Sequence, residues 1–188
     1  MDSSAKTFGL AVLFEAGLGF AGVAIAWLAD LPVSAMLDVT PTALERGLIA
    51  TLPMILMLIL LTVSRWSPLV EFRRQVEAIV RLLFARNSWL ELALVSLAAG
   101  LGEELLFRGA LQPLLAIWIH PLAAVAVVSL LFGLAHALSP IYFLAATGVG
   151  LYLGWLAMAY SDLVAPIVAH GLYDFIALTY VQQRAKRG

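Results

Sequence analysis

The sequence lacks cysteine and is poor in charge, with only 12% Asp, Glu, Lys and Arg among its 188 residues. Without cysteine the chain has no disulfide, no cysteine nucleophile and no thiolate or Cys-ligated iron–sulfur metal site. Its net charge of −1 lacks the basic excess that nucleic-acid-binding proteins carry, so no nucleic-acid partner is expected. The shortage of charge also argues against a disordered chain, because disordered segments are polar and highly charged.

The sequence is instead rich in long apolar stretches. Hydrophobic residues make up 63% of the chain and the mean hydropathy is +0.99, whereas soluble domains are about half apolar. This composition predicts an all-α, polytopic membrane protein, with residues 1–188 forming a single transmembrane helical bundle. About six stretches approach the length of roughly 20 residues that a transmembrane helix needs. They cover residues 8–29, 46–63, 89–118, 121–138, 141–160 and 163–181.

The loops differ in charge, and this difference predicts how the chain is oriented. Basic residues gather between residues 65 and 86 and again at residues 184–187, whereas the loop at residues 30–45 carries only acidic charges. Positively charged loops of membrane proteins face the cytoplasm. We therefore expect an integral protein of a cytoplasmic membrane, bacterial in view of its small size, with the N-terminus and the C-terminus both cytoplasmic.

Residues 69–86 have the spacing of an amphipathic helix. Apolar residues recur along one face, and the arginines lie mostly between them. This pattern predicts a helix that lies on the membrane surface rather than across it. Such a helix would either fix the topology as a positively charged linker or dock a substrate or a lipid, and the sequence leaves both interpretations open.

Charged groups inside a bilayer are costly, so each one within a predicted span is a functional candidate. Glu91 and His120 lie near the ends of spans and are expected at the membrane interface. Glu15 lies about two turns into the first span, and the sequence assigns it no catalytic role.

The third span carries two adjacent glutamates followed by an arginine. Glu104 and Arg108 are four residues apart and share one helix face, where an ion pair would offset the cost of burying both charges. Adjacent residues on a helix point about 100° apart, so Glu103 does not share that face. We expect Glu103 to face a polar cavity, in which a partly desolvated carboxylate is able to act as a general base.

Two further spans contribute proton-active side chains. The fourth span contains His136, and the sixth contains His170 and Asp174, four residues apart on one face. A lone histidine in a membrane helix is more simply explained by a hydrogen bond to a neighbouring helix. Three helices that each direct such a group inward indicate a catalytic or proton-transfer site instead.

These residues form three short motifs in a fixed order, EExxxR at 103–108, FxxxH at 132–136 and HxxxD at 170–174. In order, spacing and placement on helices they resemble the CPBP family of intramembrane proteases, also called the CAAX prenyl protease type II or abortive-infection domain family. The resemblance covers residues 88–182, which would form a CAAX-protease-like core. Residues 1–65, expected to form two accessory transmembrane helices, show no such resemblance.

The resemblance implies a role for each motif residue. Glu103 would be the catalytic carboxylate and, together with His136, would activate the water that attacks the scissile peptide bond. His170 and Asp174 would hold the substrate carbonyl or stabilise the developing oxyanion. Many family members have asparagine where this chain has Asp174, and a carboxylate donates a hydrogen bond only when it is protonated. The residues that would organise the site are Glu104, Arg108 and Phe132.

The resemblance leaves two chemistries open. Family members are often described as metalloproteases, and Glu103, His136 and His170 would then be the ligands of a zinc ion. The sequence has no His-Glu-x-x-His motif, however, in which two zinc ligands share one helix. We therefore expect a glutamate-activated water and no required cofactor, with zinc as the alternative.

Other types of intramembrane protease have motifs of their own, and the sequence can be searched for them. The Gly-x-Ser-Gly setting of intramembrane serine proteases does not occur, and no second mid-span aspartate accompanies Asp174 as an aspartic protease would require. A proton-coupled transporter or a noncatalytic membrane scaffold remains the alternative, although the chain shows no pair of repeated halves. The sequence thus predicts an intramembrane endopeptidase that cleaves a membrane-associated protein or peptide within the lipid bilayer.

Overall fold

The computed structural model describes residues 3–187, and within them the chain is helical with no strand, which confirms the predicted all-α class. Element η1 is a short 3-10 helix, and η2 is a π-helical segment. In chain order the elements are α1 (Ser3–Leu28), η1 (Val33–Leu37), α2 (Pro41–Val63), α3 (Ser67–Phe84), α4 (Trp89–Glu104), η2 (Leu105–Leu111), α5 (Gln112–Ala116), α6 (Pro121–Ala135), α7 (Pro140–Tyr160) and α8 (Val164–Arg187).

The helices make the chain a multi-pass integral membrane protein. In the part of the chain that the structure describes, 4 helices are long and apolar enough to cross a membrane, namely α1, α2, α7 and α8. The apolar helix α6 has only 15 residues, and α4 continues through η2 and α5. All the predicted stretches are therefore helical, but the predicted number of spans is approximate because two of them are short or interrupted.

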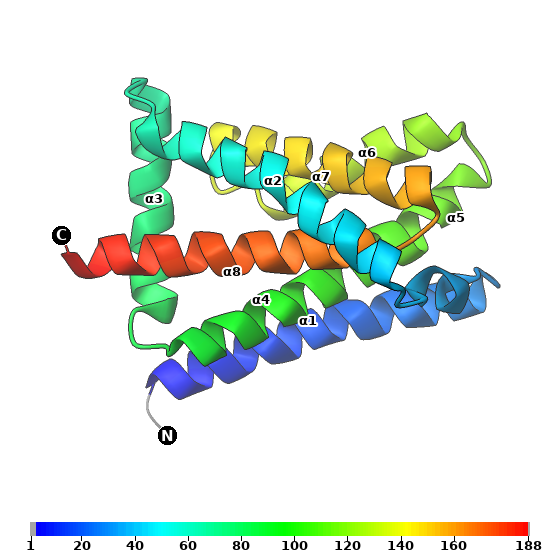
Figure 1. Cartoon of the computed structure of the whole chain (residues 1–188), viewed down its shortest axis with the longest axis horizontal. Coiled ribbons are helices and arrows are strands. Elements are labelled where there is room, and N and C mark those ends of the chain that lie inside the picture. The colour runs from blue at the N-terminus through cyan, green and yellow to red at the C-terminus, as the bar shows by residue number, and fades with distance from the viewer. Residues whose placement is uncertain (1–2, 188) are drawn as a thin grey trace.

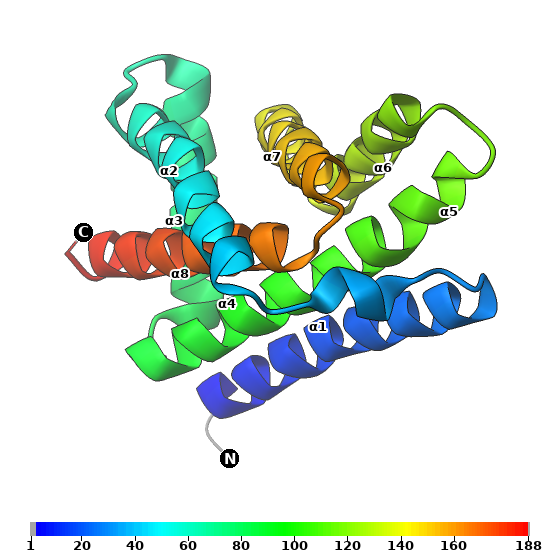
Figure 2. The same cartoon turned by 45° about the vertical axis from the view of Figure 1, so that its right-hand side comes forward.

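The long helices run roughly along one direction (Figure 1). Helix α4 packs against α1 and α8, and α2 packs against α8 on another side. Helices α6 and α7 pack against each other as a separate pair (Figure 2). Helix α3 lies across the ends of these helices, close to both chain termini, and we call this the α3 end of the bundle.

The amphipathic helix predicted from the sequence is α3, and its arginines bind neighbouring helices. Nη1 of Arg73 donates to the carbonyl oxygens of Leu61 and Ser64, each at 2.7 Å, and so joins α3 to the end of α2. Nε of Arg184 on α8 lies 3.1 Å from Oε1 of Glu77 on α3. Helix α3 is thus bound to both α2 and α8 and lies across their ends, as expected for a helix on the membrane surface (Figure 1).

Polar side chains explain where several helices begin. The Ser88 hydroxyl accepts from the backbone N–H of Glu91, and the Glu91 carboxylate accepts from the backbone N–H of Ser88, a reciprocal cap that starts α4. His120 and Ser139 each accept a backbone N–H of the helix that follows, and both of these helices begin with proline. Glu91 and His120, expected at the membrane interface, thus lie at helix N-termini.

Two glycines of α4 let its neighbours approach to backbone contact. A Cβ atom on Gly102 would collide with the carbonyl oxygen of Glu15 on α1. A Cβ atom on Gly100 would lie 2.8 Å from the backbone nitrogen of Gly171 on α8. Close approach at small residues is a usual way in which transmembrane helices pack. It holds α4, which carries Glu103, between α1 and α8.

A buried ion pair and its hydrogen bonds join this helical stretch to α7. Nη1 of Arg108 donates to Oε1 of Glu104 at 2.9 Å, and both side chains are 0% exposed, which confirms the pairing predicted from their spacing. Nη2 of Arg108 donates to the carbonyl oxygen of Gly150 at 3.1 Å. One turn further along, Nε2 of Gln112 donates to the carbonyl oxygen of Gly154 at 3.0 Å. Two donors on η2 and α5 therefore meet two glycine carbonyls on α7.

The Glu104→Ala variant should be strongly destabilised, because it leaves the charge of Arg108 buried without its partner. We expect a loss of about 3–5 kcal/mol in the free energy of unfolding, measured by denaturant titration in mild detergent. The matched control is Glu71→Ala, which removes an exposed ion pair with Arg74 at 3.9 Å. It should lose no more than about 1 kcal/mol. Equal losses in the two variants would contradict the structural role of the buried pair.

The Gly102→Ala variant should also be destabilised, because the added Cβ atom forces α1 away from α4. A loss of about 1–3 kcal/mol is expected, seen as a lower Tm in detergent. Gly17→Ala on α1 is the control, since nothing lies within 4 Å of a Cβ atom there. That variant should be at least as stable as the wild type, because alanine favours helix over glycine. An unchanged Tm for Gly102→Ala would mean that the close approach is not required.

Candidate active site

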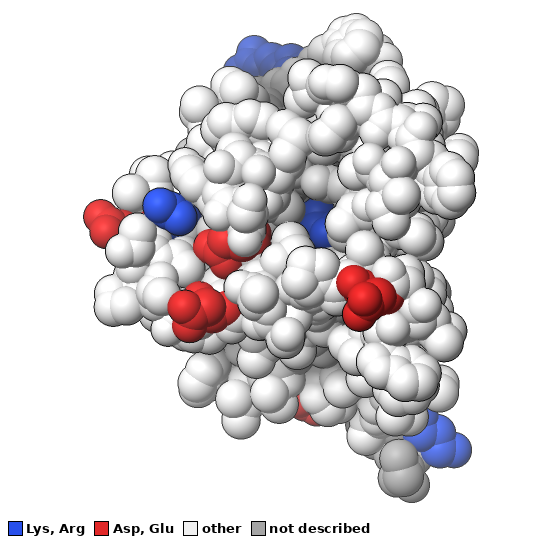
Figure 3. Space-filling model, turned by 90° about the vertical axis from the view of Figure 1, so that its right-hand side faces the viewer, with Lys and Arg blue, Asp and Glu red and all other residues white. Residues whose placement is uncertain are grey.

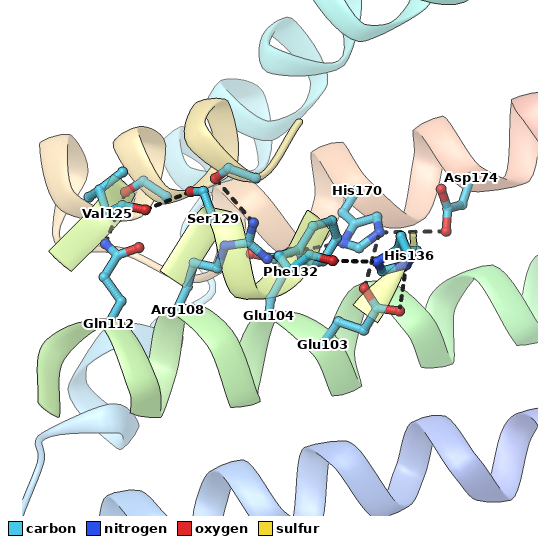
Figure 4. A network of polar contacts seen from close by, with 12 residues as sticks. Glu103, Glu104, Arg108, Gln112, Val125, Ser129, Phe132, His136, His170 and Asp174 are labelled. Carbon is cyan, nitrogen blue, oxygen red and sulfur yellow. Dashed lines mark hydrogen bonds and ion pairs between the residues drawn. The ribbon is translucent and has the colours of Figure 1, made fainter. Parts of the chain in front are cut away.

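Three helices bring four of the predicted residues into one cluster (Figure 4). Oε1 of Glu103 on α4 lies 3.8 Å from Nε2 of His136, directly after α6. Oε2 of Glu103 lies 4.0 Å from Nε2 of His170 on α8. The same nitrogen lies 3.5 Å from Oδ2 of Asp174. The Glu103 carboxylate is thus flanked by two imidazole rings from two other parts of the chain.

Hydrogen bonds on the far side of both histidines determine which ring nitrogen carries a proton. Nδ1 of His136 contacts the carbonyl oxygen of Phe132 at 2.8 Å, and Nδ1 of His170 contacts Oε1 of Glu104 at 2.8 Å. Because a carbonyl or carboxylate oxygen accepts, each Nδ1 is the donor. In the neutral ring Nε2 is then unprotonated, and Nε2 is the atom that faces Glu103.

Glu104 connects the buried ion pair to the cluster. Its Oε1 accepts from Nη1 of Arg108 and also from Nδ1 of His170. The first contact follows from spacing on one helix, whereas the second joins α4 to α8. The Arg108 guanidinium lies 4.5 Å from the ring centre of Phe132, and that ring lies 4.5 Å from the ring of His136. The three residues predicted to support the site therefore all contact one of its histidines or each other.

The cluster is buried on one side and open on the other. Glu103 and His170 are 7% and 4% exposed, whereas the side chains of His136 and Asp174 are 28% and 30% exposed. Oε2 of Glu103 is buried and makes no hydrogen bond within residues 3–187. The Glu103 carboxylate is thus enclosed, whereas His136 and Asp174 face the open side of the cluster.

A cavity of about 320 Å³ reaches the open side of the cluster. It lies among α2, α3, α7 and α8, toward the α3 end, and His136, His170 and Asp174 form part of its wall. The rest of the wall is mostly apolar or aromatic and includes Met57, Leu61, Phe72, Val76, Ala146 and Tyr173. A few polar groups at the head of an apolar cavity are typical of a binding site for a largely apolar ligand.

Sequence reasoning assigned no role to three residues that lie near the cluster. The Tyr142 ring stacks on that of His136 with centres 6.2 Å apart, and Tyr173 lines the same cavity. Aromatic residues are common in membrane helices, so no sequence signal distinguishes these two. Glu15 on α1 interacts electrostatically with His170, and its Oε2 makes no hydrogen bond among the described residues. For Glu15 the sequence does hold a signal, because a charged residue within an apolar span is a functional candidate.

The described structure provides no recognised group of ligands for the zinc ion that the sequence left open as an alternative. Among the side chains of the described chain, no group of three or more His, Cys, Asp or Glu residues is arranged to hold a metal. The two imidazoles approach different oxygens of Glu103. A zinc site requires its ligands to converge on one point, about 2 Å from each of them. We therefore derive no reaction step through a metal ion.

Comparison with known proteins adds a family to this geometry. Residues 85–176 match the family model described as Type II CAAX prenyl endopeptidase Rce1-like. No curated protein and no solved structure matches the chain. The matched segment includes Glu103, His136, His170 and Asp174. Over residues 85–176 the chain is therefore similar to the type II CAAX prenyl endopeptidases, in agreement with the resemblance to the CPBP family that its three motifs carry.

Proposed function

We propose that the protein is an intramembrane endopeptidase in which Glu103 activates the attacking water. The family assigns the chain to the proteases, and its long apolar helices make it a membrane protein. One observation supports the finer mechanism most directly. The buried Glu103 carboxylate lies near the Nε2 atoms of both His136 and His170, and these two histidines line the cavity.

The separations within the cluster suit a water molecule as the nucleophile. The distances of 3.8 and 4.0 Å from Glu103 to the two Nε2 atoms are too long for direct hydrogen bonds. Polar groups at such separations are often bridged by water. A water beside Glu103 would direct one O–H group at the carboxylate and the other at the unprotonated Nε2 of His136. Both acceptors draw proton density from the water and make its oxygen a better nucleophile.

The proposed reaction consumes only water and the peptide bond. Glu103 takes a proton from the water while the water oxygen bonds to the scissile carbonyl carbon, which gives a tetrahedral oxyanion. The C–N bond then breaks, and the proton passes from Glu103 to the leaving nitrogen. The products are a carboxylic acid and an amine, and Glu103 returns to its starting state.

His170 is the side chain best placed to stabilise the oxyanion. In its imidazolium form it donates from Nε2, and carboxylates lie at both of its nitrogens, Glu104 at Nδ1 and Asp174 near Nε2. An ionised Asp174 accepts but does not donate, so we assign it to orienting His170 rather than to binding the oxyanion. One such donor is worth about 3 kcal/mol of transition-state stabilisation in well-studied hydrolases.

The substrate that we propose is a membrane-associated protein or peptide, because the walls of the cavity are largely apolar. Both chain termini and the arginine-bearing helix α3 lie at the end toward which the cavity extends (Figure 1). If the positive-inside rule holds for this chain, that end is cytoplasmic. A substrate would then reach the cluster from the cytoplasmic half of the membrane. The family match does not favour the transporter or scaffold alternatives.

The Glu103→Gln variant should lose peptide hydrolysis and keep its fold, because an amide of the same shape cannot take the proton. We expect the rate to fall by a factor of roughly 10²–10⁴, measured as cleavage of a library of membrane-associated peptides by the full chain in liposomes. Glu91→Gln is the control, since its side chain only caps α4. A wild-type rate in the Glu103→Gln variant would refute the assignment of the base.

Treatment with a zinc chelator should leave hydrolysis unchanged, because the proposed steps need no metal. The measurement compares initial rates of the wild type before and after prolonged incubation with a strong chelator, with zinc then added back. Loss of activity that zinc restores would overturn this mechanism. It would make Glu103, His136 and His170 the metal ligands.

A further inference from the structure

Tyr142 is an aromatic residue of the cavity wall whose ring is held in place beside the catalytic cluster. It lies in the first turn of α7, and its backbone N–H donates to the Ser139 hydroxyl that caps this helix. Its ring stacks almost parallel to that of His136, at an interplanar angle of 15°. The ring of Phe72 on α3 is a second neighbour, with ring centres 5.5 Å apart, and the buried cluster that includes Phe132 is a third. These contacts from several parts of the chain fix the position of the Tyr142 ring.

The hydroxyl group of Tyr142 makes no hydrogen bond within residues 3–187. The hydroxyl of Tyr152, further along α7, instead donates to the carbonyl oxygen of Ala50 at 3.0 Å. Tyr142 lines the catalytic cavity, and its oxygen is not one of the unpartnered polar atoms that are closed to solvent. An accessible donor in the wall of a largely apolar cavity is typical of the few polar groups that orient a ligand there.

The position of Tyr142 brings this hydroxyl close to the reacting groups. It interacts electrostatically with the carboxylates of Glu103 and Asp174. Tyr142 and His136 both line the cavity, whereas Glu103 is not part of its wall. A peptide carbonyl that enters from the cavity and approaches a water held by Glu103 and His136 therefore passes beside the Tyr142 ring.

The oxyanion of the proposed reaction adds negative charge to a site that is already rich in carboxylates. The ring of His170 has carboxylate oxygens of three residues within 4.0 Å, namely Glu103, Glu104 and Asp174. Both Nη groups of Arg108 are engaged by other acceptors, and Arg108 does not line the catalytic cavity. The face of the molecule at the end opposite α3 is mainly uncharged (Figure 3), so it adds no basic patch on that side. A second donor to the oxyanion must therefore be local and must bring no negative charge.

We propose that the Tyr142 hydroxyl donates a second hydrogen bond to the oxyanion, beside the one from Nε2 of His170. This inference rests on the proposed protease function. The neutral O–H group binds the carbonyl oxygen of the substrate, and the bond strengthens as that oxygen becomes negative, while the phenol keeps its proton. Tyrosine hydroxyls serve in this way in the oxyanion holes of other enzymes. Tyr142 is then a catalytic residue that α7 adds to a cluster built by α4, α6 and α8.

The Tyr142→Phe variant tests this role, because it keeps the ring and its stacking on His136 and removes only the hydroxyl. The substrate is the membrane-associated peptide that the wild type cleaves fastest, and the full chain is assayed in liposomes. We expect kcat to fall by a factor of about 10² at an unchanged KM, because the bond is made mainly in the transition state. The Tm should equal that of the wild type, since the hydroxyl has no bond within residues 3–187 to lose. Tyr152→Phe is the control: it loses the same atom on the same helix, outside the cavity, and should keep the wild-type kcat.

A second measurement follows binding instead of turnover. A peptide of the same sequence, with a phosphinate in place of the scissile amide, carries tetrahedral, negatively charged oxygens like those of the intermediate. The Tyr142→Phe variant should bind this analogue more weakly by roughly the factor lost in kcat, because such analogues depend on transition-state contacts. The Tyr152→Phe variant should bind it as tightly as the wild type.

The outcomes separate this inference from the function on which it rests. A wild-type kcat in folded Tyr142→Phe protein, with Glu103→Gln inactive, would exclude the role of Tyr142 and leave the protease mechanism intact. A raised KM at the wild-type kcat would exclude it as well, because the hydroxyl would then bind only the ground state. A wild-type rate in the Glu103→Gln variant would overturn the proposed function, and this inference with it.

Discussion

One buried carboxylate oxygen, Oε1 of Glu104, accepts hydrogen bonds from both Arg108 and His170, and four parts of the fold depend on it. Through these bonds α4 is joined to η2 and to α8, and the second donor group of Arg108 extends the connection to α7 at Gly150. In a bundle with few other charges, each partner is costly to bury alone. The position of His170 in the cluster is therefore set by the same interaction that holds the helices together, so the geometry of the site and the stability of the fold are coupled.

The parts of the site that the sequence predicts are those fixed by spacing along one helix. Glu104 and Arg108, or His170 and Asp174, share a face whatever surrounds them. The contact between Glu104 and His170 joins residues far apart in the chain, and no local pattern indicates it. The sequence also does not predict that His136 lies just beyond the end of its helix rather than within it. The span predicted to end at residue 138 ends at Ala135, where His136 donates back to Phe132 and closes the helix. Tyr142 and Tyr173 are recognised as neighbours of the site only because they line a cavity that tertiary packing forms.

The helices outside the matched segment take part in the site. Residues 1–65 carry no motif of the family, and the sequence alone treats them as accessory. In the structure α2 supplies part of the cavity wall, including Met57 and Leu61. Helix α1 contacts Gly102, the residue before Glu103, and carries Glu15 within electrostatic reach of the cluster. The matched segment thus carries the residues that we propose as reactive groups, while the first two helices pack around them.

The length of α6 has a consequence for the surrounding lipid. Its 15 residues span about 22 Å, whereas the hydrocarbon core of a typical bilayer is about 30 Å thick. A helix this short that crosses a membrane is accommodated by local thinning of the bilayer or by flanking residues that reach the interface, at a cost of a fraction of a kcal/mol per ångström of mismatch. Thinning beside α6 would bring the headgroup region closer to His136, which directly follows this helix. Hydrophobic mismatch of this kind would make lipid chain length a determinant of where the protein resides and of how readily water and substrate reach it.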